Sequence, residues 1–278
     1  MNDTVMVGVD GSPPSIAAVD VAAEEARLRG AQLRIVHAFS RRADLDPMIH
    51  GVLAQAEQRA RALAPDLEIT RTVAPGETLT VLRSESRHAV LAVTGGRGRS
   101  GFGGLLLGST VVQLAAHGHC PLMVVRGRPD PRGPVLLAVD GSPAGEAAAG
   151  FAFAEAELRG APLTAMHVWN TRSEPTPHEG PADPLNIVVD LDRLRERHQR
   201  LLEETVAPLR HARPGVAVEL RLERARVRHA LLDAAREAQL LVTGARGHGG
   251  FTGMLLGSVS QALLYHADCP VTVVRGTE

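Results

Sequence analysis

Short runs of apolar residues alternate with longer stretches of helical periodicity along the whole chain. In the first part of the sequence, the predicted strands are Val5–Val9, Leu33–Phe39, Leu67–Val73, His88–Thr94 and Leu122–Val125. The stretches between them predict helices from Pro13 to Arg29, over 47–64 and 77–87, and from Ser109 onward. Ser12 is the predicted N-cap of the first of these helices, and Pro13 is a favourable first helical residue. Because nearly continuous apolar strands alternate with helices, the pattern indicates a doubly wound α/β fold with parallel strands and helices on both faces.

The whole pattern occurs twice. VGVDGSP at 7–13 recurs as LAVDGSP at 137–143, whereas the later Gly95 recurs as Gly244, at a larger offset. The second copy therefore carries a net insertion, which we expect as a surface loop at about 170–187 because that stretch is rich in Pro, Ser and Glu. We predict two tandem domains, residues 1–128 and 134–278, joined by a linker at 129–133.

Composition restricts the function. The net charge of −1 gives no global reason to bind nucleic acid or a membrane surface, and no signal peptide or membrane-spanning run is visible, so we expect a cytoplasmic protein. All 30 basic residues are arginines. The absence of lysine excludes a P-loop lysine, a kinase-type lysine and a Schiff base. Any phosphate would have to be held by backbone amides, hydroxyls, arginines or a metal ion.

Two glycine-rich segments are the strongest candidates for a binding site. TGGRGRSGFGGLLLGST at 94–110 and TGARGHGGFTGMLLGSV at 243–259 share 11 of 17 positions, and each follows a fourth strand and leads into a helix. Glycines allow the backbone to come close to a ligand, and a helix N-terminus favours an anion. If the strand order is 3-2-1-4-5, each segment faces Asp10 or Asp140, the end of the first strand, across the point where ligands bind in such sheets.

The spacing G-x2-G-x9-G-S in both segments resembles the nucleotide-binding motif of the universal stress protein family. VDGS after the first strand and the endings CPLMVVR and CPVTVVR are also similar to that family, so the resemblance covers nearly the whole chain. It implies two Rossmann-like five-stranded sheets of order 3-2-1-4-5, paired through their fifth strands. It also implies that ATP, with or without Mg²⁺ or Mn²⁺, is bound by a stress-response regulator or sensor.

The candidate nucleotide-binding residues follow from this match and from the charged residues of the two segments. In the first half they are Asp10, Ala38, Gly95, Arg97, Gly98, Gly108, Ser109 and Thr110. In the second half they are Asp140, Val168, Gly244, Arg246, Gly247, Gly257, Ser258, Val259 and Ser260. The aspartates would contact ribose, Ala38 and Val168 adenine, and the glycines and serines the phosphates. Trp169 follows Val168 and is expected beside adenine. The second half departs from the first in having no Pro-Gly turn after its third strand.

Other interpretations stay open. The protein could be a slow ATPase or nucleotidyl-handling enzyme with a metal near Asp10 or Asp140, or an interaction scaffold with vestigial sites. GRGRSG at 96–101 fits a dinucleotide fingerprint formally, but it follows the wrong strand. HGHC at 117–120 is more typical of a helix-to-strand turn than of a metal site. His37 and His167 are more typical of structural histidines than of catalytic ones. The protein partner, the stress and dimerisation of the chain are not determined by the sequence.

Overall fold

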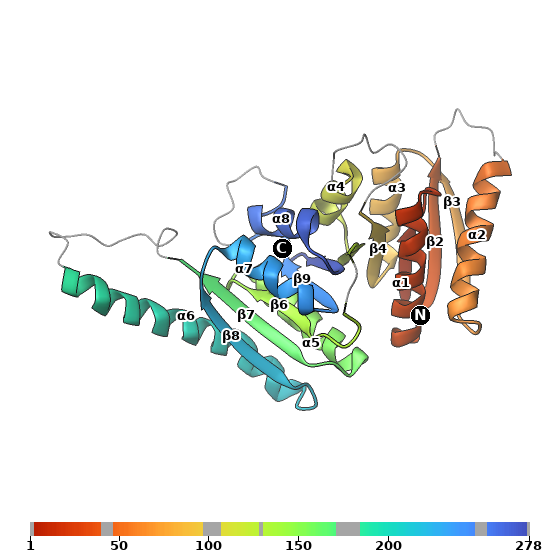
Figure 1. The fold of residues 1–278 in the computed structure, drawn as a ribbon. Coiled ribbons are helices and arrows are strands. Elements are labelled where there is room, and N and C mark those ends of the chain that lie inside the picture. Colours follow the sequence, from red (N-terminus) through yellow and green to blue (C-terminus); the bar gives the residue numbers. More distant parts are fainter. Residues whose placement is uncertain are drawn as a thin grey trace.

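The computed structural model of the chain describes residues 3–39, 47–96, 107–127, 130–170, 184–247 and 255–276 (Figure 1). The first half contains β1 (Thr4–Gly8), α1 (Pro13–Arg29), β2 (Gln32–Phe39), α2 (Pro47–Leu63), β3 (Ile69–Pro75), α3 (Thr78–Glu85), a 3-10 turn (Ser86–His88), β4 (Leu91–Gly95), α4 (Ser109–His117) and β5 (Leu122–Val125). The second half contains β6 (Val135–Val139), α5 (Pro143–Arg159), β7 (Leu163–Trp169), α6 (Pro184–Ala212), β8 (Val218–Arg224), α7 (Val227–Ala234), a 3-10 turn (Ala235–Glu237), β9 (Leu240–Gly244), α8 (Ser258–His266) and β10 (Val271–Val274).

All ten strands form one sheet, in the order β3-β2-β1-β4-β5-β10-β9-β6-β7-β8. Each half therefore has the predicted order 3-2-1-4-5, and the neighbours within each half are parallel. The halves join where β5 and β10 pair antiparallel, with Met123 opposite Thr272. The doubly wound fold and the pairing through the fifth strands are confirmed, and together they make a mixed, mainly parallel sheet.

Helices cover both faces of this sheet. One hydrophobic cluster lies between the sheet and α1, α2, α5 and α6, and includes Leu33, Leu53, Phe153 and Leu202. The other lies between the opposite face and α3, α4, α7 and α8. Since side chains of a strand alternate between faces, the central strands are apolar at nearly every position.

The helices α1 and α5 begin and end at residues suited to those positions. Ser12 and Ser142 cap them: the Ser12 hydroxyl accepts from the Ser15 amide at 3.4 Å, and the Ser142 hydroxyl from the Gly145 amide at 3.1 Å. A proline follows each cap, where its missing N–H costs nothing. These are the cap and first helical residue that the sequence predicted.

Two arginines tie the halves together beside the β5–β10 pair. Arg126, which follows β5, donates from Nε to the carbonyl of Ala267 at 2.7 Å, and also to the carbonyls of Leu264 and Tyr265, at the end of α8. Its counterpart Arg275 donates to the carbonyl of Gly118, after α4, at 2.8 Å. Each half thus supplies a cation to the negative end of a helix in the other half.

The structure corrects three element boundaries. The insertion expected as a loop at about 170–187 is helical from Pro184, because α6 has 29 residues against 17 in α2. Its remaining part, 171–183, and part of the expected linker at 129–133 lie outside the described residues. The third strand lies at Ile69–Pro75, and the fourth begins at Leu91 rather than His88 because a 3-10 turn precedes it.

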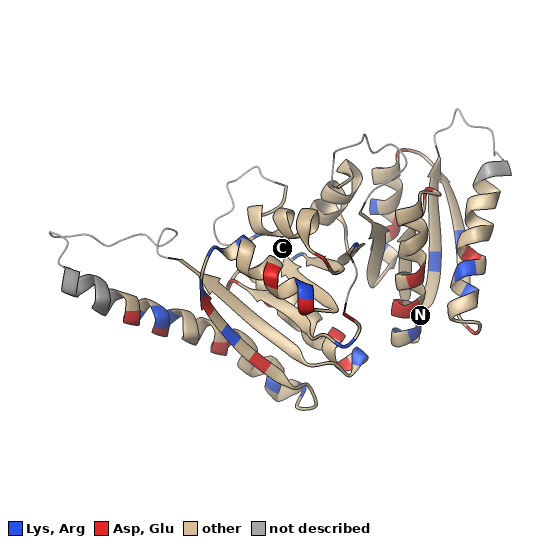
Figure 2. Ribbon diagram, in the orientation of Figure 1, with Lys and Arg blue, Asp and Glu red and all other residues tan. Residues whose placement is uncertain are grey.

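Charged residues of both signs are interspersed along α2, β8 and α6 (Figure 2), in keeping with the net charge of −1. Among the described residues, no helix combines the length and the apolar character that crossing a bilayer requires.

Candidate functional site

The turns after β1 and β6 place an aspartate at the carboxyl end of each first strand. Gly11 and Gly141 follow these aspartates with φ of 82° and 75°, a left-handed conformation that glycine adopts without strain. The chain can thereby reverse from strand into helix. Oδ1 of Asp10 and Oδ1 of Asp140 each accept the amide two residues later, from Ser12 and Ser142, at 3.0 Å. One carboxylate oxygen of each aspartate is therefore used to shape its own turn.

Histidines at the ends of the second strands support the same turns. Nδ1 of His37 lies 2.8 Å from the carbonyl oxygen of Val9, and Nδ1 of His167 lies 2.7 Å from that of Val139. A carbonyl only accepts, so each Nδ1 carries the proton and donates. His167 then accepts at Nε2 from Nδ1 of His198, 2.8 Å away. These contacts support the structural interpretation of both histidines.

Backbone hydrogen bonds join the two described ends of each glycine-rich segment. The Gly108 amide donates to the carbonyl of Gly96 at 3.1 Å, and the Gly257 amide to the carbonyl of Ala245 at 2.9 Å. Gly96 and Ala245 donate in turn to the carbonyls of Val125 and Val274, at the ends of the fifth strands. The described ends of each segment are thus held together beside the carboxyl ends of the fourth and fifth strands. Arg97, Gly98 and His248, within them, lie outside the described residues.

In the second half, the structure brings the first-strand aspartate and the glycine-rich loop into contact. The Ser142 hydroxyl lies 2.7 Å from Oδ1 of Asp140 and 3.1 Å from the carbonyl oxygen of Arg246. A Cβ atom on Gly247 would overlap Oδ2 of the same aspartate. Asp140, Arg246 and Gly247 therefore lie close together between the ends of β6 and β9. The sequence identified Ser12 only as a helix cap, and its counterpart's link to the loop became visible only in the structure.

Gly95 and Gly244 have a packing role that the motif did not reveal. A Cβ atom on Gly95 would lie 2.5 Å from the backbone carbonyl of Pro14, and one on Gly244 would lie 2.8 Å from the carbonyl carbon of Ala144. The fourth strand in each half thus ends directly against the first turn of α1 or α5. The requirement for glycine here follows from helix packing, whether or not a ligand also approaches.

The N-termini of α4 and α8 differ from those of α1 and α5. Their N-cap residues are Gly108 and Gly257, and neither helix has a side-chain cap. The first amides of a helix have no partner within the helix. Space is open around Gly108, since a Cβ atom there would meet only Val111, at 4.0 Å. The N-termini of α4 and α8 can therefore bind an anion.

The other predicted residues at the beginning of α4 and α8 differ in their exposure and in their hydrogen bonds. Ser109 and Ser258, the first residues of α4 and α8, are exposed, and Thr110 and Val259 are half-buried. Ser260 is buried and donates to the carbonyl of Gly244 at 2.6 Å, so only its amide remains for a ligand.

The predicted adenine contacts lie at the ends of the second strands. Ala38 packs against the cluster beneath α3 and α4, and Val168 belongs to the same cluster in the second half. Trp169, one residue later, points to the opposite face, where it stacks on His198 of α6 with ring centroids 4.8 Å apart. The expectation that Trp169 lies beside adenine therefore does not fit the alternation of side chains along β7.

Metal ligands and reactive thiols are the other groups that could carry chemistry. The described ranges contain no group of three or more His, Cys, Asp or Glu side chains placed to hold a metal ion. Cys120 lies between α4 and β5, as a turn residue should, and burial raises the pKa of Cys120 and Cys269 to about 12. Both thiols are therefore protonated and poor nucleophiles at neutral pH.

Comparison with known proteins agrees with this architecture. The family model described as "Universal stress protein family" matches residues 1–126 and 131–275. A universal stress protein of Mycolicibacterium smegmatis is 39% identical over 98% of this chain and 96% of its own length. A universal stress protein of Mycobacterium tuberculosis is 33% identical over 98% of this chain and 96% of its own length. Among solved structures, a universal stress protein of Archaeoglobus fulgidus aligns over 100% of both chains with a TM-score of 0.71 at 18% identity, a likeness of fold.

Proposed function

The chain belongs to the universal stress protein family, and we propose that each half binds one molecule of ATP as the signal of a regulatory protein. The triphosphate would sit at the N-terminus of α4 or α8, and the ribose would face Asp10 or Asp140. Adenine would lie toward Ala38 or Val168. Bound nucleotide would then change the surface that the protein offers to a partner.

One observation carries this proposal: the helices that follow the glycine-rich loops have no side-chain cap, whereas α1 and α5 are capped by their own serines. The open amides and the positive end of the helix dipole attract an anion. Both open ends stand at the carboxyl ends of β4 and β9, next to the neighbouring β1 and β6. This is the switch point at which doubly wound sheets bind nucleotides.

The side chains around this point suit a phosphate and a sugar. The exposed hydroxyls of Ser109 and Ser258 lie in the first turn of their helices and can donate to phosphate oxygens. Asp140 keeps Oδ2 on the loop side of its turn, where it can accept from a ribose hydroxyl. Since no cluster of metal ligands exists among the described residues, Mg²⁺ or Mn²⁺ would arrive with the phosphates, whose charge it would partly neutralise.

We assign the nucleotide a regulatory rather than a catalytic role. Nδ1 of His37 and Nδ1 of His167, the histidines closest in sequence to the predicted adenine contacts, each donate to a backbone carbonyl. That bond fixes the tautomer and orientation of both rings, and Nε2 of His167 is in addition engaged by His198.

Calorimetric titration of nucleotide-free protein with Mg-ATP tests the proposal directly. Two equivalents of bound ATP are expected per chain. One equivalent would restrict the proposal to a single half, and absence of binding would contradict it.

The variants Gly108→Asp and Gly257→Asp test the helix ends themselves. An aspartate N-cap should occupy the open amides and stabilise α4 or α8 by about 0.5–1 kcal/mol. Its charge should also repel phosphate, so each variant should lose one ATP site. Higher stability together with lost binding cannot arise from misfolding. Gly150→Ala, in the middle of α5 with open space around it, is the matched control and should bind two equivalents. Unchanged binding in both aspartate variants would refute the assignment of the helix ends.

A further inference from the structure

The second half has an N-terminal extension of α6 relative to the described length of α2. The helices α2 and α6 both end shortly before the third strand of their half, at Leu63 and Ala212. Because α6 has 29 residues and α2 only 17, the additional turns lie at the beginning of α6. In Figure 1, α6 runs along β7 and β8 at one end of the sheet.

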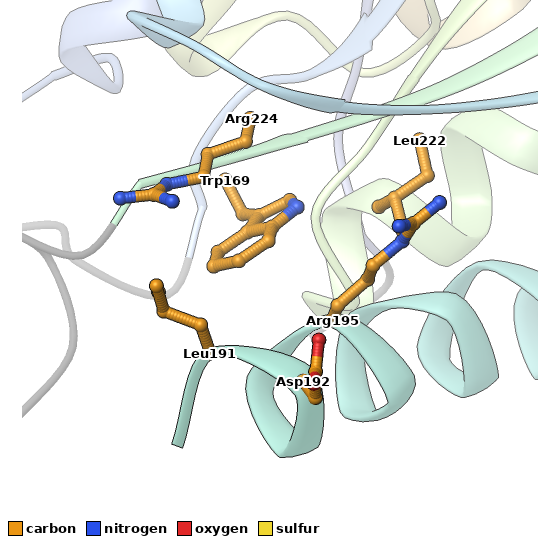
Figure 3. A pocket seen from close by; sticks show the side chains of 6 residues that line it. All are labelled: Trp169, Leu191, Asp192, Arg195, Leu222 and Arg224. Carbon is orange, nitrogen blue, oxygen red and sulfur yellow. The ribbon is translucent and has the colours of Figure 1, made fainter. Parts of the chain in front are cut away.

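The extension closes a pocket against the ends of β7 and β8 (Figure 3). The pocket has a volume of about 330 Å³ and is lined by Trp169, Leu191, Asp192, Arg195, Leu222 and Arg224. This volume lies at the lower end of the range for small-molecule sites. One face of the Trp169 ring stacks on the ring of His198, with an angle of 23° between the rings. The pocket thus has a rigid aromatic wall.

Two arginines give the pocket a positive rim. The guanidinium carbon of Arg224 lies 5.7 Å from the centroid of the Trp169 ring, and Arg195 approaches from α6 on the other side of that ring (Figure 3). Both arginines are exposed. In the part of the chain that the structure describes, neither forms an ion pair with a carboxylate, although Asp192 lines the same pocket. Their charge is therefore available to an anion.

The corresponding described positions of the first half carry different side chains. Phe39 stands where the second half has Trp169, and Pro75 where it has Arg224. The pocket is also separate from the proposed ATP site, because Trp169 and the neighbouring Val168 point to opposite faces of the sheet.

We propose that this pocket is a second ligand site, specific for a small organic anion with a planar apolar body. The body would lie against Leu191, Leu222 and the exposed edge of Trp169, and a carboxylate, sulfonate or phosphate would pair with Arg195 or Arg224. Aromatic rings pack favourably edge to face, and a guanidinium group can donate two parallel hydrogen bonds to such an anion. The proposal goes beyond nucleotide binding and does not depend on it.

The test uses the full chain and the fluorescent anion 8-anilinonaphthalene-1-sulfonate. Trp169 is the single tryptophan of the chain, so energy transfer from it reports a probe bound near this residue, and the arginine variants assign the probe to the pocket. Saturable transfer is expected for the unchanged protein. Arg195→Ala and Arg224→Ala should each weaken the affinity for the probe about tenfold. Arg221→Ala, which removes an exposed arginine of β8 paired with Glu223, should leave it unchanged.

Two further measurements distinguish this site from the proposed ATP site and from non-specific hydrophobic adsorption of the probe. Saturating Mg-ATP should not displace the probe, and the uncharged analogue N-phenyl-1-naphthylamine should bind at least about tenfold more weakly because it lacks the anion. Equal affinity in all three arginine variants would overturn the proposal, as would displacement by ATP. ATP calorimetry is read independently, so failure of either proposal leaves the other one tested.

Discussion

Glu25 of α1 and Glu155 of α5 are buried at the junction of the two halves, and both are paired with the same two arginines, Arg29 and Arg159. Each carboxylate is 1% exposed. Arg29 contacts both glutamates, and so does Arg159, which lies 3.0 Å from Glu155. The four charges form a pseudo-symmetric cluster in which each half supplies one Glu and one Arg. Burial without partners would be costly, so the cluster requires both halves.

The first prediction concerns the pH dependence of stability. Burial, together with the Glu25 carboxylate, raises the pKa of Glu155 from 4.5 to about 7. Folding therefore takes up a proton between these two values, and the contribution of Glu155 to the free energy of unfolding is greatest below pH 4.5. It should decrease as the pH rises to about 7, by at most about 1.4 kcal/mol per pH unit.

Urea unfolding of the wild type and of Glu155→Gln, measured at several pH values from 4.5 to 8, checks this. The free energy of unfolding of Glu155→Gln should lack this decrease, so its difference from the wild type should change across the interval. Glu157→Gln, an exposed glutamate of the same helix, should follow the wild-type curve. Parallel curves for wild type and Glu155→Gln would show that the pKa of Glu155 is not raised.

The second prediction concerns the arginines at the β5–β10 junction. Arg126→Ala should lower the free energy of unfolding by about 2–4 kcal/mol, because three partly buried carbonyls at the end of α8 lose a charged donor. Arg275→Ala should cost less, since it removes one such bond. Chemical unfolding measures both. Arg27→Ala, which removes only an exposed pair with Glu24, should stay within about 1 kcal/mol of wild type. If Arg126→Ala lowered the free energy of unfolding as little as Arg27→Ala does, the capping role of Arg126 would be contradicted.

The third prediction compares two serines at helix starts. Ser142→Ala should destabilise the protein by about 1–2 kcal/mol, because it removes the cap of α5 and the contact with Asp140. Ser258→Ala, at an exposed and uncapped helix start, should change stability by less than about 0.5 kcal/mol but should weaken ATP binding. Thermal unfolding and calorimetry separate these effects. The reverse order of stabilities would mean that the two helix ends have been assigned the wrong roles.

The fourth prediction separates two kinds of glycine. Gly95→Ala should destabilise the protein by about 1–3 kcal/mol, because the new Cβ would meet the Pro14 backbone at 2.5 Å. Gly150→Ala should instead stabilise it by about 0.5–1 kcal/mol, since the site is an open helix interior. Unfolding midpoints in urea provide the comparison. Tolerance of alanine at Gly95 would mean that the strand end can move away from α1.

Much of the architecture was predictable because it is encoded locally. The period of apolar residues predicted β1 to β5 and their helices, and Ser12 with Pro13 marked the beginning of α1. The repeat of VDGSP predicted the second half. Such signals depend on neighbours a few residues apart, so they survive in the sequence itself.

Other features of the site depended on residues that are distant in sequence. The motif drew attention to Gly95, but contact with Pro14 explains why a glycine is needed there. The motif also did not show that Ser142 holds the backbone of Arg246. The repeated Glu-x3-Arg at Glu25 and Glu155 was visible, yet nothing in the spacing shows that these side chains meet.

The sequence by itself determined the order and type of the elements, their duplication and the position of the two loops. Only the tertiary structure decided that α6 begins at Pro184 and closes a pocket around Trp169, and that Glu25 and Glu155 share their arginines. The physical reason is that hydrogen bonding and apolar periodicity act along a segment, whereas burial and charge pairing depend on which surfaces the packed segments bring together.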